Sequence, residues 1–229
     1  DLINLPKDFF DWLYDISKEV EHQRRRFQPK SYQSRAIDKI TNYFETQNKA
    51  RGQYIAACGS GKTLTSLWIK EKLGAQRTLF LVPSIYLIKQ TLNEWLNQRS
   101  DNFVFCCVCS GNDQDLYIND PDDPTVDFVD IDPNELGVKV TTNKEELEIF
   151  LLHNATNNIV IFSTYHSSSV VSTAIKSAEE KFDLMVCDEA HKTAGVEGVF
   201  SRVLEDEFIP SKNRLFLTAT PRILSSEAI

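Results

Sequence analysis

The sequence is poor in several residue types and patterns, and each scarcity excludes a class of protein. No apolar run in the 229 residues approaches the ~20 residues that a membrane-spanning helix requires. The first residues lack the basic stretch and following apolar stretch of a secretory signal peptide. Five cysteines are too few, and odd in number, for a disulfide scaffold, which favours a reducing compartment. We therefore expect a globular protein of the cytoplasm.

Lysine and arginine are absent between Arg99 and Lys139, although the chain has 25 of them against 33 acidic residues. The same stretch holds ten carboxylates: Asp101, Asp113, Asp115, Asp120, Asp122, Asp123, Asp127, Asp130, Asp132 and Glu135. The remaining 23 acidic residues nearly balance the basic ones. The net charge of −8 therefore does not exclude a nucleic-acid partner, but we expect binding to be weak and salt-sensitive.

From Gln53 onward, short β-type runs alternate with amphipathic helical runs. The predicted strands are Gln53–Ala57, Thr78–Val82, Phe103–Cys109, Asn158–Ser163, Leu184–Cys187 and Arg214–Leu217. The predicted helices are 8–26, Ser31–Glu45, Lys62–Leu73, Ile85–Asn97, Lys144–Leu152, Ser167–Lys181 and Val199–Phe208. This alternation predicts an α/β fold with a mostly parallel central sheet and helices on both faces. Residues 110–142, rich in Asp, Pro and Asn, are expected to form an acidic surface insertion.

The strongest chemical signal is Ala56-Ala57-Cys58-Gly59-Ser60-Gly61-Lys62-Thr63. It fits the phosphate-binding P-loop pattern except that Ala56 replaces the first glycine, and a strand precedes it while a helix follows. Gly59 and Gly61 let successive backbone N–H groups, Ser60 included, point at one anion. Lys62 would reach the β- and γ-phosphates, and the Thr63 hydroxyl would bind Mg²⁺. The alternative, a glycine turn before an ordinary helix, explains less of this pattern.

A second acidic motif, Val186-Cys187-Asp188-Glu189-Ala190-His191, follows an apolar strand. Adjacent carboxylates at the carboxyl end of a strand lie where open α/β sheets bind ligands. Asp188 would hold Mg²⁺, largely through water, and Glu189 would orient and deprotonate an attacking water. An Asp-Glu pair that caps a helix is the alternative, and the upstream P-loop favours the catalytic interpretation.

These two motifs together resemble those of superfamily 2 helicases and translocases of the DEAH-box type. The segment 27–33 resembles the family's Q-type element, whose glutamine, here Gln33, reads adenine. The segment Thr218-Ala219-Thr220 resembles motif III, which links the ATP site to the nucleic-acid site. The resemblance implies that His191, Thr218 and Thr220 couple the two sites, and that the cofactors are ATP and Mg²⁺.

The resemblance extends to segments that contact the nucleic-acid backbone in this family. Pro83-Ser84 and Gln90-Thr91 resemble motif Ia, and Ser163-Thr164-Tyr165 resembles the next backbone-contacting motif. The motor domain of bacterial restriction enzymes is similar to two further stretches, 182–195 and 214–222. Type ISP enzymes look most similar, and the motor subunits of type I and type III enzymes look more distantly similar. These motors hydrolyse ATP to move along duplex DNA, so the resemblance implies duplex DNA as a partner.

The resemblance covers about residues 27–222 and implies a division of the chain. It implies a helical extension over 1–50, a RecA-like lobe over 51–222, and the start of a linker over 223–229. The family's motor has a second RecA-like lobe that carries arginine fingers, and only nine residues follow Thr220. Because an arginine finger is worth ~10³–10⁵ in rate, we expect this piece to bind nucleotide weakly and to hydrolyse it very slowly.

Cys106, Cys107 and Cys109 form a tight cluster. A structural zinc site needs four ligands at turn-like spacing, whereas neighbouring residues on a strand point to opposite faces. Buried free cysteines are therefore expected.

Other functions compete with a DNA motor. An RNA or repair helicase of the same superfamily would share every motif, and stimulation by RNA rather than duplex DNA would reveal it. A nucleotide-dependent scaffold could bind DNA without translocating, but it has no need of the water-activating Glu189. A small-molecule kinase also uses a P-loop, and Gln33 together with the Thr-Ala-Thr segment counts against it.

Overall fold

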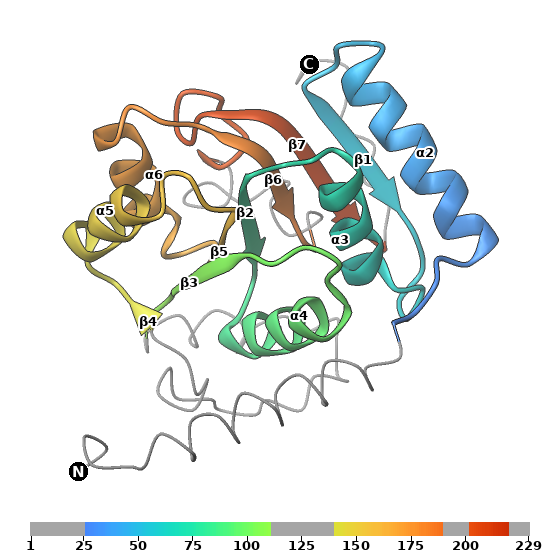
Figure 1. The fold of residues 1–229 in the computed structure, drawn as a ribbon, viewed down its shortest axis with the longest axis horizontal. Helices are drawn as coiled ribbons and strands as arrows, with labels where there is room; N and C mark the ends of the chain where they lie inside the picture. The colour runs from blue at the N-terminus through green and yellow to red at the C-terminus, as the bar shows by residue number, and fades with distance from the viewer. Residues whose placement is uncertain (1–25, 111–139, 190–201, 220–229) are drawn as a thin grey trace, which may run out of the picture.

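The computed structural model describes residues 26–110, 140–189 and 202–219 of the chain. The helices are α2 (Ser31–Glu45), α3 (Lys62–Lys72), α4 (Ile85–Gln98), α5 (Lys144–His153) and α6 (Ser168–Ser177). The strands are β1 (Arg51–Ile55), β2 (Arg77–Val82), β3 (Val104–Val108), β4 (Val140–Thr141), β5 (Ile159–Thr164), β6 (Phe182–Cys187) and β7 (Ser211–Thr218). Strands and helices alternate along the chain, as the sequence pattern predicts (Figure 1).

The strands form one parallel sheet in the order β1-β7-β6-β2-β5-β3-β4. The predicted α/β fold with a parallel sheet is confirmed, and each predicted strand is present. Strand β4 was not predicted, because its two residues lie at the end of the expected insertion over 110–142 and are too few to show a period. It adds to the sheet edge by pairing Val140 with Cys107 of β3.

Successive side chains along the strands point to opposite faces of the sheet and pack into two separate hydrophobic cores. On β2, Phe80 packs with the core under α2, α3 and α4, whereas Leu79 and Leu81 pack with the core under α5 and α6. Because both faces are covered, the inner strands β2, β5 and β6 are largely apolar rather than alternating, whereas the edge strand β1 and the start of β7 carry polar residues. Figure 1 shows the two groups of helices on the sheet. The cysteine prediction is confirmed, since Cys106 and Cys107 are buried free thiols in different cores.

Two predicted helices end earlier than the sequence suggests. Helix α6 ends at Ser177 rather than Lys181, because Glu179 adopts a left-handed conformation with φ 54°. Arg202 is helical, but residues 203–208 form turns and irregular backbone, so the predicted helix Val199–Phe208 does not extend past Arg202. The buried Arg214 guanidinium on β7 draws the carbonyls of Val203, Glu205 and Ile209 toward itself, which is incompatible with helical hydrogen bonding.

Helix α2 has the predicted bounds and packs on the same core as the sheet. Ile37 and Phe44 are buried there, with Ala36 and Ile40 partly buried beside them. Gly52 on β1 permits this packing, since a Cβ would lie 3.1 Å from Phe44 Cζ. The predicted helix over 8–26 lies outside the described residues, and so does most of the acidic insertion. Among the residues that are described, no helix is long and apolar enough to cross a bilayer.

Candidate nucleotide-binding site

The P-loop connects β1 to α3 at the carboxyl edge of the sheet, where α/β proteins bind ligands. Gly59 and Gly61 adopt left-handed conformations with φ values of 72° and 78°. Gly61 is the N-cap of α3, and no side chain caps this helix. The first N–H groups of α3 and the positive end of its dipole are therefore available to an anion. This geometry fits the phosphates of a nucleotide.

Lys62 is buried at the start of α3, and its ammonium group lies over the loop. Its Nζ donates a hydrogen bond to the carbonyl of Ala56 at 3.2 Å. The N–H of Ala56 in turn donates to the carbonyl of Thr218, at the end of β7, at 3.0 Å. The loop is thus tied to the strand that leads into the predicted coupling segment.

Gln33 on α2 connects the Q-type element to the P-loop. Its side chain is 5% exposed; its Nε2 donates to the carbonyl of Ser60 at 3.1 Å, and its Oε1 accepts from the N–H of Lys30 at 2.9 Å. The hydroxyl of Tyr32 donates to the same Ser60 carbonyl at 3.0 Å. Gln33 therefore lies against the P-loop, and its contact with adenine stays a prediction.

Asp188 follows β6 at the same sheet edge and is 6% exposed. Burial, and to a smaller extent the charge of Glu189, raises the pKa of its carboxyl group to about 6. A hydrogen bond from the N–H of Glu189 to Asp188 Oδ1, at 3.0 Å, and the nearby charge of Lys62 lower the pKa in part. The P-loop and Asp188 thus lie at the same edge of the sheet, close enough for the charge of Lys62 to act on Asp188.

Glu189 has a left-handed backbone with φ 48°, which is unusual for a residue with a side chain. Strained backbone of this kind clusters at functional sites. The pair of predicted Mg²⁺ ligands, Thr63 and Asp188, supplies few protein ligands, and within the described ranges no group of three or more His, Cys, Asp or Glu residues forms a metal cage. His191 and Thr220 lie outside the described residues.

The predicted nucleic-acid residues are mostly buried in this structure. Pro83, Thr91, Ser163, Thr164 and Tyr165 are all buried. Their side chains therefore do not reach a ligand on the surface in this conformation. The hydroxyl of Tyr165 instead donates to the carbonyl of Asp188 at 2.8 Å, and its N–H donates to the carbonyl of Val82 at 3.0 Å. Tyr165 thus ties β2, β5 and β6 together beside the site.

The other motif Ia residues have different environments. The Ser84 hydroxyl caps α4 by accepting the N–H of Leu87 at 3.4 Å. Gln90 is exposed on the outer face of α4. Of the predicted contacts with nucleic acid, Gln90 is thus exposed and Ser84 is half-buried.

Sequence reasoning missed Trp95, which contacts the site from α4. Its indole N–H donates to the carbonyl of Thr63 at 3.1 Å. A tryptophan on the apolar face of a predicted helix indicates only a core position, and the pattern gives no sign of this hydrogen bond.

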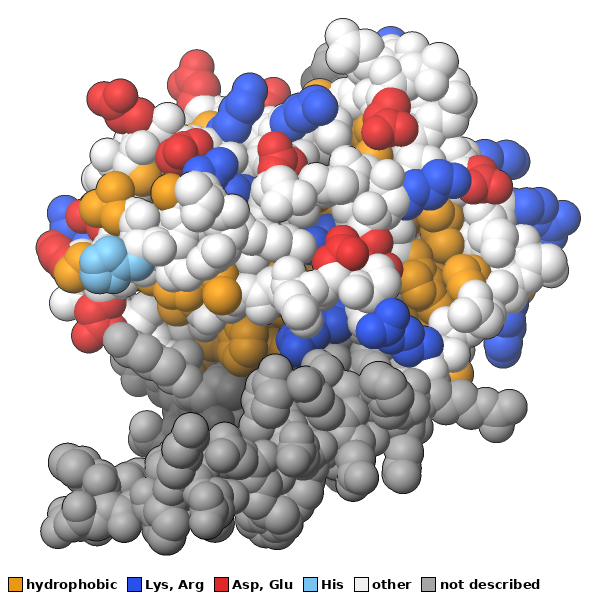
Figure 2. Space-filling view, viewed as in Figure 1, with side chains coloured by type: hydrophobic (Ala, Val, Ile, Leu, Met, Phe, Trp, Pro, Cys, Tyr) orange, Lys and Arg blue, Asp and Glu red, His pale blue; other side chains and the backbone are white. Residues whose placement is uncertain are grey.

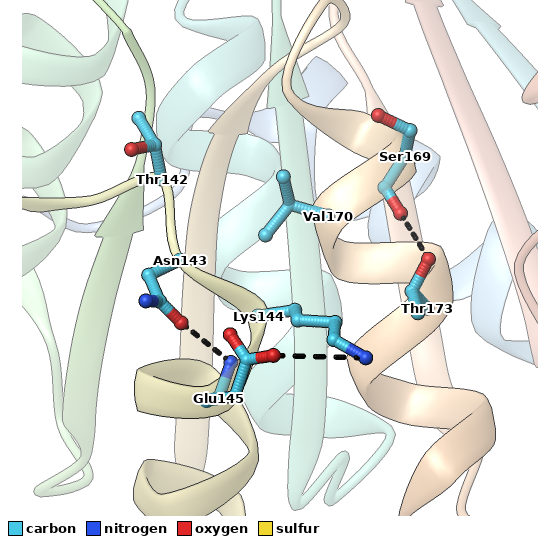
Figure 3. A pocket seen from close by; sticks show the side chains of 7 residues that line it. All are labelled: Thr142, Asn143, Lys144, Glu145, Ser169, Val170 and Thr173. Carbon is cyan, nitrogen blue, oxygen red and sulfur yellow. Dashed lines mark hydrogen bonds and ion pairs between the residues drawn. The ribbon is translucent and has the colours of Figure 1, made fainter.

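A cavity of about 520 Å³ lies away from the P-loop, between the first turns of α5 and α6. Figure 3 shows its lining, which is Thr142, Asn143, Lys144, Glu145, Ser169, Val170 and Thr173. Its polar groups have local partners, since Asn143 caps α5, Lys144 pairs with Glu145 at 3.7 Å, and the Thr173 hydroxyl donates to the carbonyl of Ser169 at 2.9 Å.

Over the described part of the face in Figure 2, acidic and basic side chains are interspersed.

The sheet order, the P-loop and the facing Asp188 define a RecA-like lobe of the helicase and translocase class. The model of the family described as "Type III restriction enzyme, res subunit" matches residues 26–223. The chain therefore belongs to this family.

Solved structures and curated relatives support this assignment. The chain is 29% identical to the ATP-dependent Type ISP restriction-modification enzyme LlaBIII bound to DNA, with a TM-score of 0.71 over 87% of this chain and 13% of that one. It is 28% identical to a nuclease-deletion mutant of the Type ISP enzyme LlaGI in complex with a DNA substrate mimic, with a TM-score of 0.65 over 86% of this chain and 18% of that one. A probable helicase of African swine fever virus (isolate Tick/Malawi/Lil 20-1/1983) is 27% identical over 96% of this chain. The chain spans 23% of that viral protein's length.

Proposed function

We propose that this chain is the ATP-binding lobe of a motor that couples ATP hydrolysis to movement on duplex DNA, as part of a restriction-modification enzyme. The observation that carries the proposal is the placement of the P-loop and Asp188 at the same edge of the sheet, where Lys62 opens the uncapped helix α3 close enough for its charge to act on Asp188. A structural loop has no need of a buried lysine beside a buried aspartate, because each pays a desolvation cost.

Phosphate binding follows from the geometry of the loop. Gly59 and Gly61 turn the backbone so that N–H groups of the loop and the first turn of α3 converge on one anion. Lys62 exchanges its hydrogen bond with the Ala56 carbonyl for one with a phosphate oxygen, which is the stronger acceptor because it is charged. Gln33 holds the Ser60 carbonyl and so keeps the loop in shape beneath the nucleotide.

The carboxylates would provide the metal site and the base. Mg²⁺, when bound, would neutralise charge on the β- and γ-phosphates. Thr63 Oγ1 and the Asp188 carboxylate are the groups of this chain that would hold it. Glu189, which follows β6 in a left-handed conformation, would accept the proton of the attacking water. Arginine fingers from a second RecA-like lobe would complete the site, and that lobe is a proposed partner.

Duplex DNA is proposed as the nucleic-acid partner because LlaBIII and LlaGI were solved with DNA or a DNA mimic. The test is a calorimetric titration of a non-hydrolysable ATP analogue with Mg²⁺ into the chain, alone and with duplex DNA or RNA of equal length. Tighter nucleotide binding with duplex DNA than with RNA supports the proposal. Tightening by RNA alone would replace it with an RNA helicase function.

A further inference from the structure

Among the residues that the structure describes, Trp95 makes one polar contact, and its partner is the residue expected to bind Mg²⁺. The indole N–H donates to the carbonyl of Thr63 at 3.1 Å, and the side chain is fully buried. Thr63 stands in the first turn of α3, directly after Lys62. Tryptophan is the aromatic residue that combines this bulk with an N–H donor, so phenylalanine could fill the space without making the bond.

The indole is held in place by three aromatic neighbours. It packs edge-on against Phe80 at 5.2 Å and 88°, against Phe162 at 5.6 Å and 79°, and against Phe103 at 6.3 Å and 74° between ring centroids and planes. Phe80 belongs to β2, which leads to Pro83, and Phe162 belongs to β5, which leads to Tyr165. One side chain thus contacts both strands that end in predicted nucleic-acid segments.

Helix α4 has an outer face that is open to nucleic acid and an inner face that packs toward Thr63 at the proposed nucleotide site. Gln90 is exposed on the outer face, whereas Thr91 and Trp95, four residues apart, are buried on the inner face. A displacement of α4 by a ligand at Gln90 therefore moves the indole donor relative to Thr63. A hydrogen bond weakens steeply with distance and angle, so the position of α4 affects the backbone of Thr63.

We propose that Trp95 is a positioning residue that couples α4 to Thr63, so that nucleic acid on α4 changes the affinity for Mg²⁺–nucleotide. The coupling is distinct from the expected role of Thr218 and its neighbours, because it enters the site through α3 rather than through β7. The proposal rests on the proposed function, since it assigns a linkage between the same two ligands.

The test measures nucleotide affinity of the full 229-residue chain by calorimetry, with and without duplex DNA, in Mg²⁺ and in EDTA. The variant is Trp95→Phe, and the matched control is Trp68→Phe on α3, which removes a half-buried indole that packs on the same core. Two ratios are compared: the nucleotide affinity with DNA over that without DNA, and the nucleotide affinity in Mg²⁺ over that in EDTA. We expect each ratio to fall about two- to tenfold in Trp95→Phe, which is the range that one hydrogen bond supplies. Trp68→Phe should leave both ratios unchanged.

A purely structural role would lower the melting temperature and leave both ratios intact. If Trp95→Phe does not fold, 3-benzothienylalanine at position 95 keeps the bicyclic shape and replaces the N–H by sulfur. If either variant at position 95 folds and keeps both affinity ratios of the wild type, the proposal is overturned. Nucleotide binding without any DNA linkage in the wild type also overturns it, but leaves ATP binding in place. Failure of the wild type to bind nucleotide at all contradicts the proposed function instead.

Discussion

Gly61 and Gln33 lie so close together that a side chain at position 61 would push the Gln33 amide aside. A Cβ at Gly61 would lie 2.8 Å from Gln33 Nε2, and Gly61 has φ 78°. Gln33 Nε2 in turn holds the carbonyl of Ser60 at 3.1 Å. The glycine of the P-loop therefore serves two purposes, the left-handed turn and the close approach of α2.

Gly61→Ala should destabilise the chain more than Gly59→Ala does. Both glycines have positive φ, which costs roughly 1–3 kcal/mol for alanine, but a Cβ at Gly59 meets open space. Urea unfolding of the two variants measures the difference. Adding Gln33→Ala to Gly61→Ala should recover part of the loss, since the colliding amide is removed. Equal destabilisation by the two glycine variants would contradict this contact.

Asp188→Asn should stabilise the nucleotide-free chain above pH 6 and change little near pH 4. Burial raises the pKa of Asp188 from 3.8 to about 6, so the native state binds a proton more tightly than the unfolded chain. The free energy of unfolding therefore falls as pH rises through this window, by about 2–3 kcal/mol. Thermal unfolding in EDTA at pH 4 and pH 8 tests this, with the exposed Asp101→Asn as control. Equal stability of wild type and Asp188→Asn at pH 8 would refute it.

Glu189→Gln should retain nucleotide binding and lose hydrolysis. The amide keeps the size of the side chain but cannot accept the proton of water, and general-base catalysis supplies roughly 10²–10⁴ in rate. Single-turnover hydrolysis of radiolabelled ATP is the measurement, and Glu180→Gln, a surface residue paired with Arg77, is the matched control. Unchanged hydrolysis in Glu189→Gln would remove Glu189 from the catalytic role.

The fold was predictable because the pattern is strong where the structure is regular. The parallel sheet, the bounds of α2 and the strand–P-loop–helix unit all follow from apolar periodicity and the glycine spacing. Strand β4 was not predictable, because its two residues are too few to show an alternation of apolar and polar side chains. The end of α6 was not, because nothing in the sequence marks Glu179 for a left-handed conformation.

The sequence predicts which residues belong to the candidate site, but it does not predict the hydrogen bonds that they make. Lys62, Asp188 and Gln33 meet at one edge of the sheet, as their motifs imply. The hydroxyl of Tyr165 and the indole of Trp95 find backbone carbonyls at Asp188 and Thr63, and these pairs are set by tertiary packing over 23 and 32 residues of separation. No local pattern encodes such pairs, and the contact of Tyr165 with nucleic acid stays a prediction.

The most direct test of ATP binding by this lobe is the affinity of Lys62→Ala for Mg²⁺–nucleotide. Calorimetry should detect binding to the wild type and lose it in Lys62→Ala, because the buried ammonium group is the main cation at the phosphates. Lys72→Ala, at the other end of α3 and paired with Asp38 on the surface, should bind as the wild type does. Equal binding by wild type and Lys62→Ala would contradict the P-loop assignment and the motor function built on it.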